Sequence, residues 1–320
     1  MKLGAHTSFF VKLLVTLVLI AALIAFIDLG VFAHHLDNVR WAYVVGAGLC
    51  VLLAILLSAW KWGLLLRARG YPLPFGRLMR HYFVGLFFNN VLPSTVGGDA
   101  VRAWETAKDI DNTPEAVGSV ITERLIAGIG LGLTAALGLP FLDDGASFVW
   151  LVALFLAING SLAALLIVPK IADGVARSLI PSRADRLQST VVETIRVVRE
   201  GFSRPALVGT VLVASIVFQV FVAAVNYCLF AAFNVEVSLA ACVLLTPMAF
   251  TVTMIPVSLS GIGVREGAYA FFFALVGVST EAAVLVSLAF FVLVAIASLP
   301  GAIFFIKGRR TPKGALEDAA

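Results

Sequence analysis

Long, unbroken blocks of apolar residues constrain this chain more than any other feature of its sequence. Six blocks reach the roughly 20 residues that an α-helix needs to cross a bilayer: 11–33, 41–65, 117–139, 148–168, 206–231 and 282–306. Of the 320 residues, 61% are hydrophobic and only 13% are charged. A soluble fold of this length has too little interior to hide so much apolar surface. The sequence therefore predicts an all-α integral membrane protein with about six full spans.

The same blocks exclude several other classes. A transmembrane β-barrel alternates polar and apolar residues along each strand, which these blocks do not do. The composition also excludes a disordered chain and a coiled coil. The first block, near Lys2 and Lys12, begins like a signal peptide, but its apolar run is too long for one, so we expect an uncleaved span. The three cysteines lie in apolar stretches and are expected to be small buried hydrophobes: Cys50, Cys228 and Cys242.

Basic residues are distributed unevenly between the loops. Lys and Arg follow the second and last blocks and fill the loop between the fourth and fifth, whereas 34–40, 140–147 and 232–238 carry few. Because basic loops face the cytoplasm, both termini are predicted to be cytoplasmic, with 311–320 as a short tail of a multi-pass protein of the cytoplasmic membrane. These loops account for the net charge of +4, so no nucleic-acid partner is expected.

Two further apolar segments, 78–110 and 239–277, are interrupted by proline and glycine. The charge rule places both ends of the first in the cytoplasm and both ends of the second outside. Each is therefore predicted to enter the membrane and return on the same side, as a re-entrant helical hairpin. Irregular backbone survives at such depth only when it is buried in protein or lines a wet cavity.

A shift of 163 residues relates the two broken segments. It pairs four residues of the first with four identical residues of the second: Pro93, Gly98, Val101 and Arg102 with Pro256, Gly261, Val264 and Arg265. Each half of the single transmembrane domain 1–320, about 1–140 and 147–310, then holds three spans and one hairpin. Because three is odd, the second half is inverted, a pattern that many transporters share.

Each turn combines a flexible backbone with an arginine. The predicted hinges are Pro93, Gly97 and Gly98 in the first segment and Pro256, Gly261 and Gly263 in the second, because proline removes a donor and glycine permits a tight turn. A new helix is expected to begin near Ala100, capped by Asp99, and another near Val264. At the start of each new helix, the free N–H groups and an arginine together make an anion site, because the planar fork of arginine matches phosphate.

The arginines also have a structural explanation. Arg102 lies near the cytoplasmic edge and either binds phosphate, pairs with Glu105, or reaches lipid headgroups. Arg265 lies within an apolar hairpin, where a charge is costly and is usually functional, so ligand binding is favoured over pairing with Glu266.

Span three adds Glu123 and Arg124, for which an ion pair with the hairpin is the simpler role and proton transfer by Glu123 the alternative. The candidate substrate site comprises Asn90, Arg102, Glu105, Glu123, Arg124, Ser258, Arg265 and Glu266. His34 and His35 have no third ligand in view, so neither a metal nor a cofactor is expected.

Residues 184–200 carry an apolar helical stripe of Leu187, Val191, Ile195 and Val198 with charges on the other faces. This pattern indicates an amphipathic helix. It lies either on the cytoplasmic membrane surface or against the helix bundle.

Three motifs carry a resemblance to a known family: 90–102 (NVLPSTVGGDAVR), 123–125 (ERL) and 256–267 (PVSLSGIGVREG), the last followed by an apolar final span. With them, nearly the whole chain resembles the flippase-like transmembrane domain of lysylphosphatidylglycerol synthases and its standalone relatives. The resemblance implies movement of lipids between leaflets, aminoacylated phospholipids in the fused proteins and glycolipid carriers in others. Only a short tail follows Lys307, where the fused proteins add an aminoacyl-transfer domain, so synthase activity is not expected.

Three functions compete on these grounds. The leading hypothesis is a lipid translocase that passes the headgroup between the two hairpins while the acyl tails stay in lipid. The second is a membrane partner that scaffolds a glycosyltransferase or another lipid-modifying enzyme. An embedded enzyme acting on lipid phosphates is the weakest, because no catalytic His/Asp/Ser or metal-ligand constellation is evident. The lipid, the direction, the energy source and the oligomeric state are left open.

Overall fold

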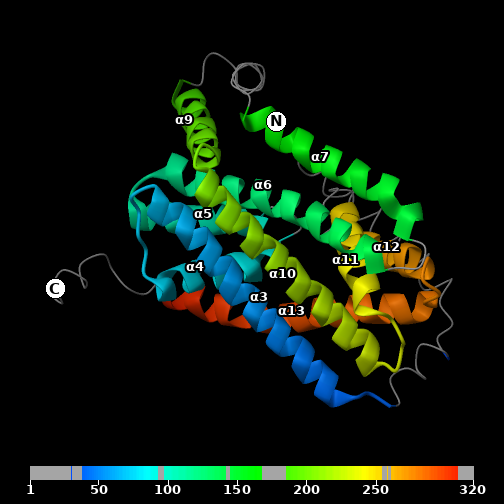
Figure 1. Ribbon diagram of the computed structural model, residues 1–320. Helices are drawn as coiled ribbons and strands as arrows, with labels where there is room; N and C mark the ends of the chain where they lie inside the picture. The colour runs from blue at the N-terminus through cyan, green and yellow to red at the C-terminus, as the bar shows by residue number, and fades with distance from the viewer. Residues whose placement is uncertain are drawn as a thin grey trace, which may run out of the picture.

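The computed structural model describes residues 38–92, 97–141, 145–167, 185–253 and 261–308, together with Gly30 and Ser258. All regular structure in these residues is helical (Figure 1). The elements are α3 (Trp41–Ala68), α4 (Phe75–Val91), α5 (Gly97–Ile110), α6 (Thr113–Gly138), η1 (Leu139–Phe141), η2 (Gly145–Phe148), α7 (Val149–Ile167), α9 (Asp185–Phe202), α10 (Pro205–Ala232), α11 (Leu239–Thr253), α12 (Val264–Ala274) and α13 (Thr280–Gly308). The predicted span 11–33, the hinges Pro93 and Pro256, and the tail 311–320 lie outside the described residues.

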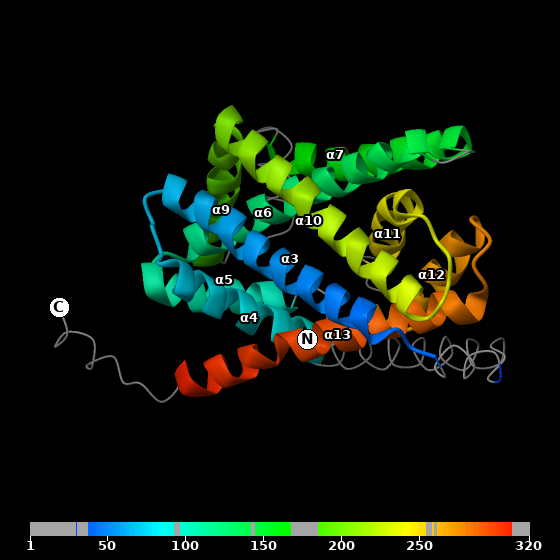
Figure 2. The same ribbon diagram turned by 60° about the horizontal axis from the view of Figure 1, so that its bottom comes forward.

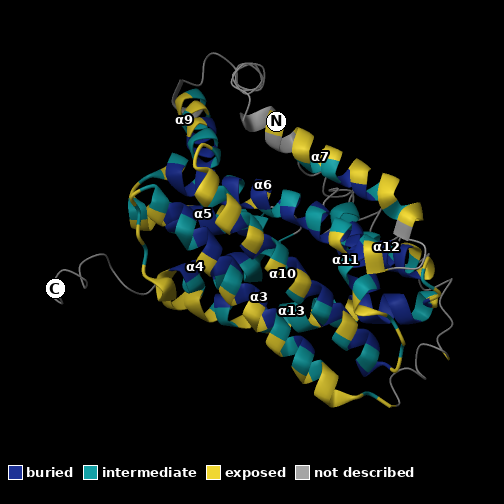
Figure 3. Cartoon of the chain, viewed as in Figure 1, coloured by how far each residue is buried: buried dark blue, intermediate teal, exposed yellow. Residues whose placement is uncertain are grey.

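Four helices in the described part of the chain are long and apolar enough to cross a bilayer: Trp41–Ala68, Thr113–Phe141, Pro205–Ala232 and Thr280–Lys307. They confirm four of the predicted spans. The block 148–168 coincides with α7, but the apolar helix at this place, Ala146–Ser161, is shorter than a full span. The total of six spans therefore stays a prediction. Large apolar side chains of α3 and α7 such as Leu49, Leu53 and Ile158 are exposed, and Figure 3 shows exposed residues along both helices. Such side chains suit contact with lipid tails.

Helices α3 and α10 lie side by side along their whole length (Figure 2). Residue numbers rise along α3 where they fall along α10. Arg40 N donates to Ala232 O over 2.9 Å at one end, and Lys61 Nζ donates to Ser215 Oγ over 3.0 Å towards the other. The two helices are therefore antiparallel. They are the second spans of the two predicted halves.

The first broken segment forms a helical hairpin of α4 and α5. Three pairs show that the two helices are antiparallel, because the residue number rises along α4 as it falls along α5: Arg77 with Asp109, His81 with Thr106, and Asn89 with Gly98. The helices touch at Gly98, where an added Cβ would lie 1.9 Å from the carbonyl oxygen of Gly85. Gly98 is thus required for close approach of two backbones.

The start of α5 differs from the prediction. The helix begins at Gly97, and the Oδ1 of Asn89 accepts a hydrogen bond from Gly98 N over 2.9 Å. Asp99 therefore lies inside the first turn and is not the cap. The reason is that a side chain from the other arm of the hairpin supplies the acceptor, which leaves the Asp99 carboxylate available elsewhere.

The second broken segment forms a hairpin of α11 and α12, in which the ring of Phe250 stands perpendicular to that of Tyr269 at 6.3 Å. Gly261 and Gly263 adopt φ values of +75° and +83°, which favour glycine. Helix α12 begins at Val264, as predicted. Both broken segments are therefore helical hairpins, while their position in a membrane stays a prediction.

Each hairpin docks on the last span of the other predicted half, and the two hairpins lie at opposite ends of α3 and α10 (Figures 1 and 2). In α13, a Cβ on Gly301 would lie 2.1 Å from the carbonyl oxygen of Phe83 in α4. In α6, a Cβ on Gly138 would lie 3.0 Å from Leu244 N and 3.1 Å from Ala240 O in α11. Gly138 and Gly301 are related by the same shift of 163 residues.

Candidate functional site

Five charged side chains from three helices meet beside the first hairpin. We call them the ionic cluster: Lys61 of α3, Asp99 and Arg102 of α5, and Glu123 and Arg124 of α6. Lys61 lies seven residues before the end of α3 and Glu123 ten residues after the start of α6. At 1.5 Å per residue, the cluster lies about 10–15 Å inside the ends of these helices.

The signs of the charges alternate through the cluster. Arg124 holds Asp99 with two hydrogen bonds, Nε to Oδ2 at 2.7 Å and Nη2 to Oδ1 at 2.8 Å. Arg102 Nη2 lies 3.4 Å from Asp99 and 3.2 Å from Glu123. The other oxygen of Glu123 lies 2.8 Å from Lys61 Nζ. The result is a continuous chain of ion pairs.

This chain of ion pairs leads from the surface to the interior. The side chain of Arg124 is 48% exposed and that of Asp99 14%, whereas Arg102 and Lys61 are only 2% and 1% exposed. A molecule that approaches the cluster from the surface of the protein therefore meets Arg124 first.

The cluster carries one more positive than negative charge, because three cations face two carboxylates. Arg102 Nε is buried and has no hydrogen-bond partner among the described residues. Its guanidinium lies 4.8 Å from the centre of the Trp62 ring and 5.4 Å from that of Tyr82, so aromatic faces supply part of its environment. A buried cation with a free donor is costly unless something pairs with it, so the cluster is suited to a further anion.

A second network locks the hairpin beside the cluster. His81 Nδ1 lies 3.1 Å from Thr106 Oγ1, and His81 Nε2 lies 3.1 Å from Asp109 Oδ2. This hydroxyl, imidazole and carboxylate resemble a hydrolase triad, which the sequence did not reveal because the residues come from two helices. However, Thr106 is fully buried and its hydroxyl donates to the carbonyl of Arg102 over 2.9 Å. The network therefore holds the backbone that carries Arg102.

The second hairpin carries an ion pair without net charge, formed by Arg265 and Glu266. Arg265 donates to Glu266 Oε1 from Nε at 3.0 Å and from Nη2 at 2.5 Å, and its Nε also lies 3.2 Å from Ser287 Oγ. The other carboxylate oxygen of Glu266 accepts from Gly263 N over 2.6 Å, at the start of α12. The guanidinium lies 4.6 Å from the centre of the Phe291 ring. The two hairpins thus match in backbone form but differ in charge.

The remaining predicted site residues lie outside the ionic cluster. Glu105 pairs with Lys108 at 2.8 Å and lies 3.9 Å from Arg80, so it is not the partner of Arg102. The amide of Asn90 donates to Leu86 O and to Ser298 Oγ of α13. The hydroxyl of Ser258 is buried without a partner among the described residues.

Sequence reasoning missed two members of the cluster. Lys61 was not included in the candidate site, but α3 continues to Ala68 and leaves its side chain buried. Asp99 was assigned only to the cap. The available signal was a lysine inside an apolar block, since an intramembrane charge usually has a partner or a function.

The helix α9 packs against the bundle through its apolar stripe. Ile195 and Val198 are buried, and Val197 lies against Gly118 of α6. Of the two positions considered for this amphipathic helix, the structure supports the one against the bundle.

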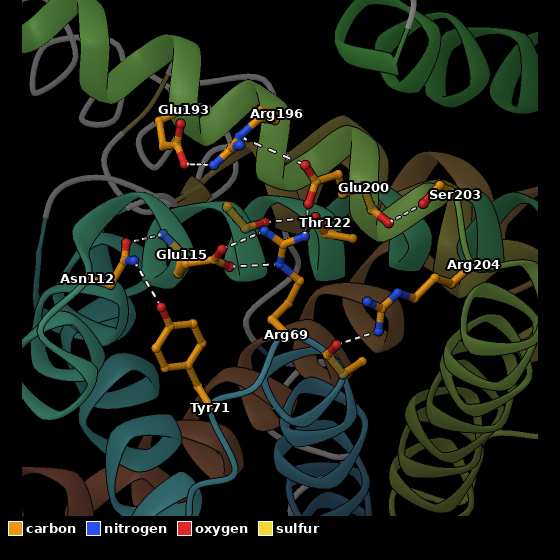
Figure 4. A network of polar contacts seen from close by, with 12 residues as sticks. Arg69, Tyr71, Asn112, Glu115, Thr122, Glu193, Arg196, Glu200, Ser203 and Arg204 are labelled. Carbon is orange, nitrogen blue, oxygen red and sulfur yellow. Dashed lines mark hydrogen bonds and ion pairs between the residues drawn. The ribbon is translucent and has the colours of Figure 1, made fainter.

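Arg69 joins α9 to the ends of two other helices (Figure 4). Its Nε lies 2.9 Å from Glu115 Oε2, and Nη1 forms an ion pair with Glu200. Asn112 caps α6 by accepting from Glu115 N over 3.1 Å and donates to Tyr71. The hydrogen bond from Arg69 lowers the pKa of the Glu200 carboxyl, because it stabilises the ionised form.

Replacing Glu200 by glutamine is expected to loosen the C-terminal turn of α9. A carboxyl with a lowered pKa stabilises the fold at pH values above its ordinary pKa of about 4.3 and loses this contribution on acidification. The exposed pair is worth less than about 1 kcal/mol, or up to a fivefold change in protection. Hydrogen exchange of 185–202, corrected for intrinsic rates, should rise in Glu200→Gln at neutral pH but not in the control Glu193→Gln. Equal exchange in both variants would contradict the role of Arg69.

Comparison with known proteins gives a family match over most of the chain. Residues 9–301 match the family described as the lysylphosphatidylglycerol synthase TM region. Three similar proteins are named UPF0104 membrane proteins. That of Methanocaldococcus jannaschii is 31% identical over 36% of this chain and 35% of the relative. Those of Methanothermobacter thermautotrophicus and Pyrococcus horikoshii are each 25% identical, over 72% and 86% of this chain and 74% and 88% of the relatives.

Proposed function

This chain belongs to the lysylphosphatidylglycerol synthase TM-region family. From this family membership and the site, we propose that the protein moves an anionic membrane lipid from one leaflet to the other. The observation that carries the proposal is the ionic cluster. It has an uncompensated positive charge, and Arg102 Nε in the first half of α5 has no hydrogen-bond partner among the described residues. In the proposal the protein has neither a catalytic activity nor a cofactor.

The phosphate of the headgroup binds at the start of α5. Arg124, which is half exposed, takes it first, and Arg102 supplies the deeper positive charge. The N-terminal N–H groups and the dipole of α5 add to the attraction. The acyl tails stay in the bilayer, in contact with the apolar outward faces of the long helices.

The second hairpin receives the headgroup near the other leaflet. Arg265 binds the phosphate there after its ion pair with Glu266 has broken. The two hairpins belong to halves 1–140 and 147–310 of an inverted repeat and enter the membrane from opposite sides. The antiparallel pair of α3 and α10 supports this symmetry, as do the equivalent close approaches at Gly138 and Gly301. Both termini face the cytoplasm in this arrangement, because basic residues collect at that end of the long helices.

The test is lipid movement by purified protein in liposomes that contain a fluorescently labelled phosphatidylglycerol. Arg124→Lys and Arg265→Lys each keep a charge but lose the planar fork, so the initial rate should fall about tenfold, the value of one charge-assisted contact. The control Arg196→Lys changes an exposed arginine of α9 and should keep the wild-type rate.

Two outcomes would contradict the proposal. If well-folded Arg124→Gln and Arg265→Ala both move lipid at the wild-type rate, these arginines are not phosphate ligands. Absence of lipid movement by the pure wild-type protein, with recovery when a glycosyltransferase or lipid-modifying enzyme is added, would favour the alternative of a scaffold.

A further inference from the structure

The carboxylate of Asp99 occupies the place on Arg124 that a bound phosphate would take. Both of its oxygens accept from the guanidinium fork, at 2.7 and 2.8 Å. Arginine holds phosphate with the same pair of parallel hydrogen bonds. A phosphate that binds Arg124 through this same Nε and Nη2 fork must therefore replace this carboxylate.

Asp99 has a second place to go when it is replaced. Its Oδ1 already lies 3.4 Å from Arg102 Nη2, and Arg102 Nε is buried without a partner in the described part of the chain. Asp99 also lies in the first turn of α5, where the helix dipole favours a negative charge. Release from Arg124 therefore leaves Asp99 paired and not isolated in an apolar environment.

The charge of the cluster limits what can replace Asp99. Three cations and two carboxylates leave one positive charge to neutralise. The other charged groups of the hairpin have partners outside the cluster, since Glu105 pairs with Lys108 and Asp109 with His81. A phosphodiester with one negative charge brings the cluster to neutrality, whereas a phosphomonoester with two exceeds it.

We infer that Asp99 is a resident counter-anion, which a singly charged phosphodiester displaces from Arg124 onto Arg102. This inference rests on the proposed function and names its substrate class. A competing counter-anion and a permanent structural pair predict opposite effects on lipid affinity when the charge of Asp99 is removed. If Asp99 competes with the ligand, removing its charge strengthens binding.

The experiment measures the affinity of short-chain phosphatidylglycerol and phosphatidate for the purified protein in uncharged detergent at pH 8, by titration calorimetry. Wild-type protein should bind phosphatidylglycerol more tightly than phosphatidate. Asp99→Asn should bind phosphatidylglycerol about tenfold more tightly than wild type does, because one charge-assisted pair no longer has to be broken. The same variant adds a second uncompensated positive charge, so its preference should shift to phosphatidate. Arg124→Gln should bind neither lipid.

Controls keep the two hypotheses apart. Glu193→Gln removes one negative charge from the exposed face of α9 and should leave both affinities unchanged. Asp99→Ser repeats the charge removal with a different polar residue, in case Asp99→Asn does not fold. If wild-type protein moves lipid but both Asp99 variants bind no more tightly, the counter-anion is refuted and the translocase stands. If wild-type protein neither binds nor moves lipid, both fail.

Discussion

Gly301→Ala is expected to destabilise the protein by about 3 kcal/mol, at the upper end of the effect of overpacking. The new methyl carbon would lie 2.1 Å from the carbonyl oxygen of Phe83 and 2.8 Å from Phe87 Cβ. Relief of the first contact requires the backbones of α4 and α13 to separate, because no flexible side chain can move aside. Gly138→Ala, with its nearest contact at 2.9 Å, should cost less.

The matched control is Gly209→Ala in α10, where an added Cβ meets nothing within 4 Å. Alanine favours a helix over glycine by about 1 kcal/mol, so this variant should be slightly more stable than wild type. The measurement is thermal unfolding in detergent followed by circular dichroism. Equal midpoints for Gly301→Ala and Gly209→Ala would contradict the close approach of α4 to α13.

Glu123→Gln is expected to cost about 3–5 kcal/mol, because it leaves two buried cations without their shared carboxylate. Lys61 Nζ lies 2.8 Å and Arg102 Nη2 3.2 Å from Glu123, and all three side chains are nearly inaccessible. Lys61→Met alone should cost less, since Arg102 still pairs with Glu123. The double variant Lys61→Met with Glu123→Gln should recover part of the loss.

A double-mutant cycle in the unfolding free energy measures this coupling. A coupling between Lys61 and Glu123 of about 1–3 kcal/mol is expected for residues in one network. The reference pair is Arg196 and Glu193 on α9, both largely exposed, for which the coupling should stay below about 1 kcal/mol. Additive effects at Lys61 and Glu123 would contradict a buried ion pair.

The proposed transport explains why such a costly cluster is maintained. Buried ion pairs contribute little net stability compared with apolar residues of the same size. In the proposed transport, an anion enters this chain of ion pairs by replacing the Asp99 carboxylate on Arg124. The network of His81, Thr106 and Asp109 keeps the Arg102 backbone in place during this exchange.

The sequence by itself determined the membrane class, four of the long spans and the family. Each of these depends on local properties, such as the length of an apolar run or the spacing of residues within one motif. The two broken segments were also predictable, because proline and glycine interrupt a helix wherever it lies. The start of α12 at Val264 follows from Gly263 just before it.

Only the tertiary structure decided which charges meet. Lys61 and Glu123 are 62 residues apart, and Asp99 and Arg124 are 25 apart; no periodicity along the chain relates them. Glu105, the partner considered for Arg102 in the sequence, pairs with Lys108. Arg102 instead pairs with Asp99 of α5 and with Glu123 of α6. The same limit hid the close approach at Gly301. The physical reason is that ion pairs and backbone contacts between helices depend on how the helices are rotated and how far they are shifted against one another. These quantities are set by the packing of all the helices together.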